Sequence, residues 1–141
     1  MERKINKFGI GTDIENIDRF TDSGFVQNSA LVNRIFTQRE QEYCFSKKTA
    51  APHLTARYCG KEAIVKALAS IGDTNVRYTD IEIINKQDGM PVVRIDKEGF
   101  RDLQIHLSLP HCKDNAIAFA IVMEIGKILT CAPKTDNPGP E

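Results

Sequence analysis

Two acidic residues, Asp13 and Glu62, have the surroundings that best fit chemistry. Asp13 lies in F-G-I-G-T-D-I-E and Glu62 in A-R-Y-C-G-K-E-A-I-V-K-A-L, and both segments are rich in apolar residues. A carboxylate at the edge of an apolar core costs several kcal/mol unless a cation or strong donors compensate it. Carboxylate oxygens are ligands that hard cations prefer. The pair therefore predicts a shared site for a hard metal ion.

Basic residues accompany Glu62 at helical spacing. Lys66 follows Glu62 by four residues and so shares its helix face, and Arg57 and Lys61 form a second pair with the same spacing. The residues alone leave two interpretations of Glu62 open. It is either half of an exposed Glu–Lys pair, which stabilises a helix by only about 0.3–0.5 kcal/mol, or an acid kept near positive charge for a chemical purpose.

The cysteines offer a competing chemistry. His111 and Cys112 are adjacent, as a base and a nucleophile would be in space, but neighbouring residues on a strand point to opposite faces. They would meet only if the chain bends there. Cys44, Cys59, Cys112 and Cys131 show no C-x-x-C spacing, so we expect reduced thiols.

Length and charge exclude several classes of protein. A chain of 141 residues fits one domain, and 19 basic residues balance 19 acidic ones. This balance gives no overall field that would attract nucleic acid or an anionic membrane. No apolar run approaches the roughly 18 residues that span a bilayer, and the N-terminal residues lack a signal-peptide core. We expect a cytoplasmic protein that binds neither nucleic acid nor membrane.

The first half of the chain predicts a strand followed by helices. Residues 4–14 alternate loosely as a strand with Asp13 near its end, and Gly9 and Gly11 allow close backbone packing. Residues 15–33 predict one or two short helices. Thr37 and Glu40 have the T-x-x-E spacing of a capping box, which predicts a helix over 38–47.

The second half begins with the central helix. Residues 50–71 have the clearest helical periodicity, with a buried stripe formed by Ile64, Ala67, Leu68 and Ile71. The elements expected after it are strands 78–85 and 91–95 joined by a turn, a short helix from Asp96 to about Leu103, and strands 105–109 and 116–125. Residues 1–126 would form the domain, and 127–141 a polar, proline-rich tail without order.

Four blocks in this order resemble the holo-acyl-carrier-protein synthases, the small-chain group of the 4′-phosphopantetheinyl transferase superfamily. The blocks are G-I-G-T-D-I-E-N-I-D-R-F, A-R-Y-C-G-K-E-A-I-V-K-A-L, D-I-E-I-I-N-K-Q-D-G-M-P-V-V, and I-H-L-S-L-P-H followed by A-I-A-F-A-I-V. The resemblance covers most of the chain. It implies an α+β fold with an antiparallel sheet packed on a long central helix in a single lobe.

The resemblance also implies an activity. The family transfers the 4′-phosphopantetheine arm of coenzyme A to a serine of an apo acyl carrier protein, releases adenosine 3′,5′-bisphosphate and requires Mg²⁺. Asp13 and Glu62 match its magnesium ligands, and Lys66 matches a lysine near the pyrophosphate. These three would be the catalytic residues. The base that takes the serine proton would be either Glu62 or a water on the metal.

Further residues match positions that contact coenzyme A or the carrier. The positions expected to bind coenzyme A are Arg57, Lys61, Lys66, Gly89, Pro91, Ser108 and His111. Gly89 is equally well explained as a hairpin turn. Arg19 and Arg34 would dock the acidic carrier, although exposed helix arginines need no partner. Relatives of this size are homotrimers, so we expect active sites between subunits.

The chain departs from the family at three positions, which keeps other functions open. Cys59 and Gly60 replace two alanines, and Pro110 replaces a Ser or Thr and removes a backbone donor. Gly60 would suit a close approach of backbone or ligand. The alternatives are a catalytically weakened module that binds the carrier or coenzyme A, and a coenzyme A-dependent acyl transfer through a cysteine.

Overall fold

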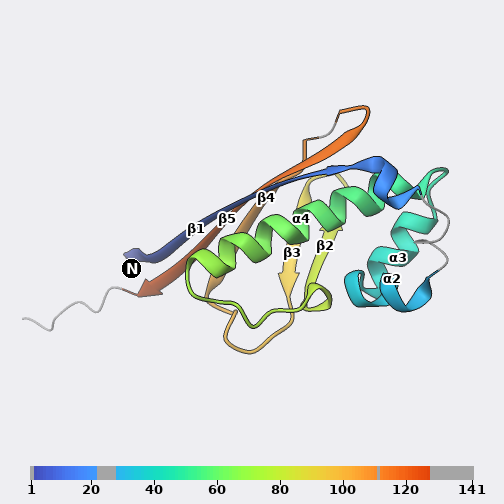
Figure 1. Cartoon of the computed structure of the whole chain (residues 1–141). Helices are drawn as coiled ribbons and strands as arrows, with labels where there is room; N and C mark the ends of the chain where they lie inside the picture. The colour runs from blue at the N-terminus through green and yellow to red at the C-terminus, as the bar shows by residue number, and fades with distance from the viewer. Residues whose placement is uncertain (1, 22–27, 111, 128–141) are drawn as a thin grey trace, which may run out of the picture.

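The computed structural model describes residues 2–21, 28–110 and 112–127, which form two antiparallel sheets around one long helix (Figure 1). The elements in chain order are β1 (Arg3–Asn16), the 3₁₀ helix η1 (Ile17–Phe20), α2 (Ser29–Ile35), α3 (Gln38–Phe45), α4 (Ala50–Ser70), the 3₁₀ helix η2 (Tyr78–Asp80), β2 (Ile81–Asn85), β3 (Pro91–Ile95), β4 (Leu103–Ser108) and β5 (Asn115–Lys127). The α+β architecture expected from the sequence is confirmed.

The larger sheet has the strand order β1-β5-β4, so the C-terminal strand is central. β1 pairs with β5 from Arg3 opposite Lys127 to Asn16 opposite Asn115. This sheet runs along α4, whereas α2 and α3 gather at one end of the helix (Figure 1). The hairpin β2–β3 forms the second sheet, with Ile81 opposite Ile95.

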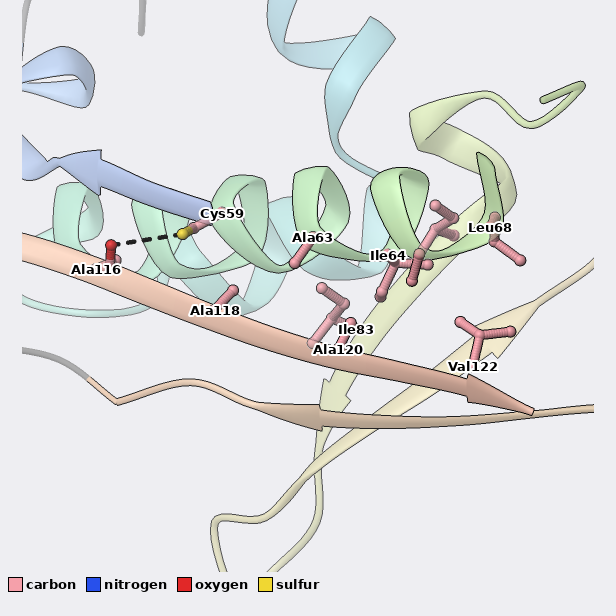
Figure 2. Packing of buried hydrophobic residues seen from close by; sticks show 11 residues of the cluster. Cys59, Ala63, Ile64, Leu68, Ile83, Ala116, Ala118, Ala120 and Val122 are labelled. Atoms are coloured by element: carbon pink, nitrogen blue, oxygen red, sulfur yellow. Dashed lines mark hydrogen bonds between the residues drawn. The ribbon is translucent and has the colours of Figure 1, made fainter. Parts of the chain in front are cut away.

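The main core lies between α4 and the sheets. Alternate residues of β5, from Ala116 to Val122, face the helix and are buried against Ala63, Ile64 and Leu68, while Ile83 comes from β2 (Figure 2). Most of these strand residues are alanines. Their small side chains allow the helix to lie close to the sheet.

Two glycines of β1 bring its backbone against α4. A Cβ at Gly11 would lie 1.9 Å from the carbonyl oxygen of Ala63, and one at Gly9 would lie 2.4 Å from that of Ala67. Two residues of a strand span about 6.6 Å, and four residues of a helix span about 6.0 Å. Because these lengths are similar and β1 and α4 run in opposite directions, every second residue of β1 meets every fourth residue of α4. The next residue of β1 that faces the helix is Asp13, which this register carries to the helical turn containing Glu62.

Two predicted helical regions differ from the structure. Glu15 and Asn16 belong to β1, because β5 offers them backbone partners as far as Asn115. The helical part of this region is limited to η1 and, from Ser29 onward, α2, while residues 22–27 lie outside the described residues. The predicted helix from Asp96 to Leu103 is wrong. This segment forms successive turns, and Gly99 has a φ of 92°, which is incompatible with an α-helix.

Within the described part of the chain, no helix has the length and apolar character needed to cross a membrane. Lys127, the first residue of the predicted tail, ends β5. The remainder of the tail, residues 128–141, lies outside the described residues.

Candidate active site

Asp13 has one engaged oxygen and one free oxygen. The Lys66 ammonium donates to Asp13 Oδ1 at 2.9 Å and to the carbonyl oxygen of Thr12 at 3.0 Å. The Asp13 side chain is 11% exposed, and its second oxygen, Oδ2, is buried without a hydrogen-bond partner among the described residues. A buried carboxylate oxygen without a donor is costly, so this atom needs a ligand that the chain does not supply.

Glu62 comes from α4 and is held by a different donor. Its Oε1 accepts a short hydrogen bond from the Tyr78 hydroxyl. No ion pair joins Glu62 to Lys66 in the described part of the chain, because the Lys66 ammonium pairs with Asp13 instead. The interpretation of Glu62 as half of an exposed Glu–Lys pair is therefore excluded by the structure.

The electrostatics of this cluster keep Lys66 charged. The hydrogen bond that Lys66 donates to Asp13 raises the pKa of Lys66, slight burial opposes it, and the charges of Asp13 and Glu62 raise the pKa further. The pKa of nearby Cys59 shifts in the same direction. Burial first, and then Asp13, raise the pKa of Cys59 to about 12, so this thiol stays protonated and is a poor nucleophile.

A third carboxylate, Glu15, lies two residues beyond Asp13 on the same face of β1. Burial raises its pKa, opposed by a hydrogen bond from Arg19 at 3.1 Å. No three His, Cys, Asp or Glu side chains among the described residues converge as a complete metal site. A metal at this cluster would therefore need further ligands from a substrate or water.

A cleft of about 900 Å³ opens on another side of α4. Four of the residues expected to bind coenzyme A line it together: Arg57, Gly89, Pro91 and Ser108. They come from α4, from the hairpin β2–β3 and from the end of β4. Long-range folding is therefore needed to assemble this set. Cys112 also lines the cleft, whereas its neighbour His111 lies outside the described residues.

Arg57 forms the charged wall of this cleft. Its guanidinium stacks on the Tyr43 ring, with Cζ 4.1 Å from the ring centroid, and Nη2 donates to Asn85 Oδ1 at 3.2 Å. The residue is 3% exposed, and its Nε is buried without a hydrogen-bond partner among the described residues. Arg57 thus has a fixed orientation in the wall of the cleft, where its positive charge favours an anion.

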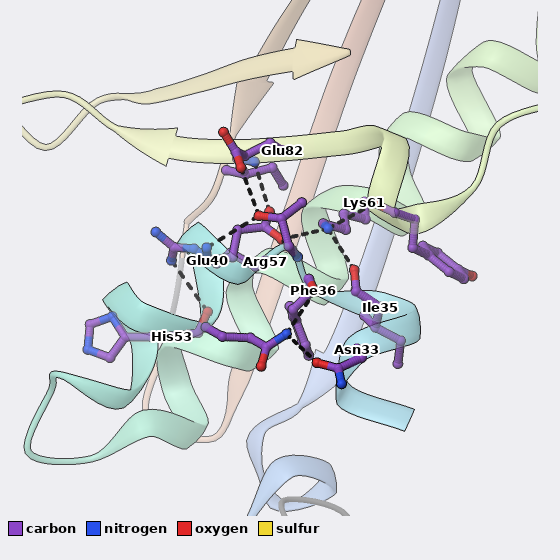
Figure 3. Close-up of polar contacts among 12 residues, drawn as sticks. Asn33, Ile35, Phe36, Glu40, His53, Arg57, Lys61 and Glu82 are labelled. Carbon is purple, nitrogen blue, oxygen red and sulfur yellow. Dashed lines mark hydrogen bonds and ion pairs between the residues drawn. The ribbon is translucent and has the colours of Figure 1, made fainter. Parts of the chain in front are cut away.

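Lys61 lies in the interior and not in the cleft. Its ammonium donates to Glu40 Oε2 at 2.7 Å and to the carbonyl oxygens of Ile35 at 2.7 Å and Tyr78 at 2.9 Å (Figure 3). An ammonium has three donors, and all three are used in a fully buried setting. The geometry therefore leaves none for a coenzyme A phosphate, and we omit Lys61 from the proposed binding residues.

The two groups of predicted residues do not share one cavity within the chain. Asp13, Glu62 and Lys66 are absent from the lining of the cleft that contains Arg57 and Ser108. Gly89, at the hairpin turn, has a φ of 85°, which explains a glycine there without any ligand.

The predicted docking arginines lie in different surroundings. Arg19 is exposed, pairs with Glu15, and lies over the Tyr58 ring at 4.8 Å from the centroid. Arg34 is exposed on α2 and has no ion pair with any described residue. Of these two arginines, only Arg34 has a guanidinium that is not paired with an acid among the described residues.

Sequence reasoning missed Tyr78 and Glu40 as parts of the site. Tyr78 was expected only as the start of a strand, and no local pattern relates it to Glu62. Glu40 was identified as a helix-capping residue, which is confirmed, because its Oε2 accepts from the Thr37 amide at 2.9 Å. Its second partner, Lys61, is distant in sequence and carries no local signal.

Comparison with known proteins identifies the family. Residues 9–120 match the model of the 4′-phosphopantetheinyl transferase superfamily. A holo-[acyl-carrier-protein] synthase from Clostridium tetani is 40% identical over 121 residues, which cover 81% of this chain and 94% of that protein.

Solved structures agree with this match. An acyl carrier protein synthase from Mycobacterium tuberculosis has a TM-score of 0.64 at 33% identity and covers 81% of this chain and 95% of its own. A holo-(acyl-carrier-protein) synthase from Bacillus anthracis, crystallised in complex with CoA (3′,5′-ADP), has a TM-score of 0.67 at 26% identity, with coverages of 82% and 96%. The resemblance inferred from the four sequence blocks is confirmed, and the chain belongs to the 4′-phosphopantetheinyl transferase superfamily.

Proposed function

We propose that this protein is a holo-[acyl-carrier-protein] synthase, which transfers 4′-phosphopantetheine from coenzyme A to a serine of an apo acyl carrier protein and releases adenosine 3′,5′-bisphosphate. The observation that carries the proposal is the juxtaposition of Asp13, Lys66 and Glu62 in a chain that matches nearly the full length of such synthases. The transfer breaks a pyrophosphate bond, so the site must stabilise phosphate charge.

Mg²⁺ is the metal that we assign to Asp13 and Glu62. The unpartnered Oδ2 of Asp13 supports this assignment, and a site with only two carboxylates suits an ion that retains water and phosphate ligands. When bound, Mg²⁺ would neutralise charge on the pyrophosphate oxygens. The chain itself supplies the orientation of the two carboxylates.

Lys66 would interact both with Asp13 and with the substrate. Its ammonium holds Asp13 Oδ1 and remains protonated and exposed at the rim of the cluster. A protonated amine at this position can donate to the departing phosphate. Lys66 therefore carries positive charge that the coenzyme A pyrophosphate can approach from solvent.

The cleft beside Arg57 would hold coenzyme A. This assignment is supported by the residues that line the cleft, which include the stacked guanidinium of Arg57 together with Gly89, Pro91 and Ser108. His111 is retained as a binding residue by resemblance only. The acyl carrier protein would dock through Arg19 and Arg34, where exposed cations favour an acidic partner.

We further propose a homotrimer with the active site between subunits. Two features support it: the acids lie outside the cleft of their own chain, and the sheet face opposite α4 exposes Ile5, Phe8, Ile10, Ile14, Ile117 and Phe119. Large apolar patches on a folded protein usually mark interfaces. A neighbouring subunit would then place its cleft against the acids of this one.

The test is transfer to an apo carrier followed by intact-protein mass spectrometry. With coenzyme A and Mg²⁺, the carrier should gain the mass of phosphopantetheine, and Asp13→Asn and Glu62→Gln should each lower the rate by about 100-fold or more. Glu98→Gln is the matched control, because Glu98 is exposed on a turn outside the site.

Each alternative function has its own outcome in this assay. A wild-type protein that leaves the carrier mass unchanged would be a binding module. In a parallel reaction with acyl-coenzyme A in place of coenzyme A, a carrier that gains only the acyl mass would indicate acyl transfer through a cysteine. Full activity in both Asp13→Asn and Glu62→Gln would reject the metal assignment.

A further inference from the structure

The Tyr78 hydroxyl donates a hydrogen bond to Oε1 of Glu62. The phenol of a tyrosine ordinarily loses its proton only near pH 10, so at physiological pH it is a neutral donor. A phenol in this state cannot take a proton from a substrate, but it can fix the oxygen to which it donates.

The backbone of Tyr78 is held by the buried ion pair. Its carbonyl oxygen accepts from Lys61, whose ammonium also pairs with Glu40 of α3. The Tyr78 ring packs against Tyr58 of α4, with 6.0 Å between centroids. The donor therefore stands on a framework tied to α3 and α4, and a residue so restrained can impose an orientation on a flexible glutamate.

Asp13 and Glu62 are each held through one carboxylate oxygen. Lys66 occupies Oδ1 of Asp13 and Tyr78 occupies Oε1 of Glu62, so one oxygen of each carboxylate is engaged by a donor of the chain. Fixing one oxygen also fixes the direction in which the other is presented. Donors of this kind around metal ligands typically contribute a factor of about 10–100 to metal affinity.

We propose that Tyr78 is a positioning residue that orients Glu62 for the metal, and that the buried Lys61–Glu40 pair holds Tyr78 in place for this purpose. The proposal rests on the proposed function. It assigns to the interior lysine a role in the reaction that needs no contact with coenzyme A.

The experiment compares Tyr78→Phe with the wild-type protein. Mg²⁺ affinity is measured by calorimetry with coenzyme A present and no carrier, so that no turnover occurs. We expect Tyr78→Phe to bind Mg²⁺ about 10-fold more weakly and to raise the KM for Mg²⁺ to the same extent, while saturating Mg²⁺ restores most of kcat. The KM for the carrier should not change.

A matched control is Ser70→Ala, which removes a hydroxyl that donates to the carbonyl oxygen of Ala67 at the end of α4 and lies in neither group of site residues. Its Mg²⁺ affinity should equal that of the wild type. Thermal unfolding of both variants checks that the fold is intact. Unchanged Mg²⁺ affinity in a folded Tyr78→Phe protein, or an equal loss in Ser70→Ala, overturns the proposal.

A result that rejects Mg²⁺ as the metal can be distinguished from one that rejects the role of Tyr78. If the wild-type protein transfers phosphopantetheine without any divalent cation, Mg²⁺ is not required and the proposed function is corrected at that point. The positioning role is then decided by a crystal structure of Tyr78→Phe. A Glu62 carboxylate in its wild-type orientation would reject the role, and a reoriented one would support it.

Discussion

Asp13 and Glu62 show how two similar side chains acquire different settings from their neighbours. Asp13 is oriented by a charged lysine and keeps one buried oxygen free, whereas Glu62 is oriented by a neutral phenol. A charged donor also lowers the electrostatic cost of an acid in an apolar setting, which a phenol does less well. The paired Lys66 therefore lowers the cost of keeping Asp13 at the edge of the core.

His53 provides a prediction at the residue scale. Burial, then Arg57 and Lys47, lower its pKa below the ordinary value of 6.5. At pH values between the pKa of His53 in the folded protein and its ordinary pKa, the unfolded chain binds more protons than the folded one. The free energy of unfolding should therefore fall as the pH drops below about 6.5, and it should level off below the pKa of the folded protein. Urea unfolding at several pH values should show a weaker fall in His53→Gln than in the wild type. Parallel curves for the two proteins would contradict the shift.

At the scale of elements, α4 organises the whole site by burying residues on most of its circumference. Its surface toward β1 contains the small residues Ala63 and Ala67. Its surface toward α3 and β2 contains Lys61, whose ammonium is surrounded by a cage of hydrogen-bond acceptors. A buried ion pair of this kind is costly to break, because the remaining charge has no water to solvate it. The cage therefore fixes α3 and η2 relative to the helix.

Replacing Lys61 by methionine should reveal the cost of that cage. Lys61→Met leaves Glu40 buried without its counterion and should lower the free energy of unfolding by about 3–5 kcal/mol, measured by urea denaturation. Lys48→Met changes an exposed lysine and should alter stability by less than about 0.5 kcal/mol. Equal stabilities of the two variants would show that the buried pair is dispensable.

The glycines offer a second test at this scale. Gly11→Ala would place a methyl group against the backbone of α4, so we expect a loss of about 1–3 kcal/mol or more. Gly60→Ala would meet Cδ1 of Ile83 at 2.8 Å, and this flexible methyl can shift. Because alanine also favours the helix by about 1 kcal/mol, Gly60→Ala should be close to neutral in thermal unfolding. A more damaging Gly60→Ala would contradict this comparison.

At the scale of the whole molecule, the larger sheet has two unequal faces. The inner face is covered by α4 (Figure 1). The outer face carries exposed apolar side chains along β1 and β5. Ile14 is 63% exposed and Ile10 is 49% exposed, in strands with well-defined register. A sheet that is apolar on both faces is typical of a protein that covers the second face by association.

Ile10→Glu tests this association. A charge in the centre of the outer face should convert the proposed trimer into monomers, because an interface cannot desolvate an unpaired carboxylate without a large cost. Sedimentation analysis should detect the change, and transfer activity should fall with it. Thr74→Glu adds the same charge to an exposed loop and should leave the assembly intact. A wild-type protein that is monomeric, yet fully active, would reject the shared active site.

The sequence by itself determined the local features of this protein. The capping box of Thr37, the long helix around Glu62 and the strand that ends near Asp13 follow from spacing and hydrophobic period, and the four blocks identified the family. The tertiary structure decided which charges are available. Lys61 and Lys66 are five residues apart on one helix, and only packing buries the first against Glu40 and leaves the second beside Asp13. The same holds for Tyr78, because contact with Glu62 depends on long-range folding that no local pattern encodes.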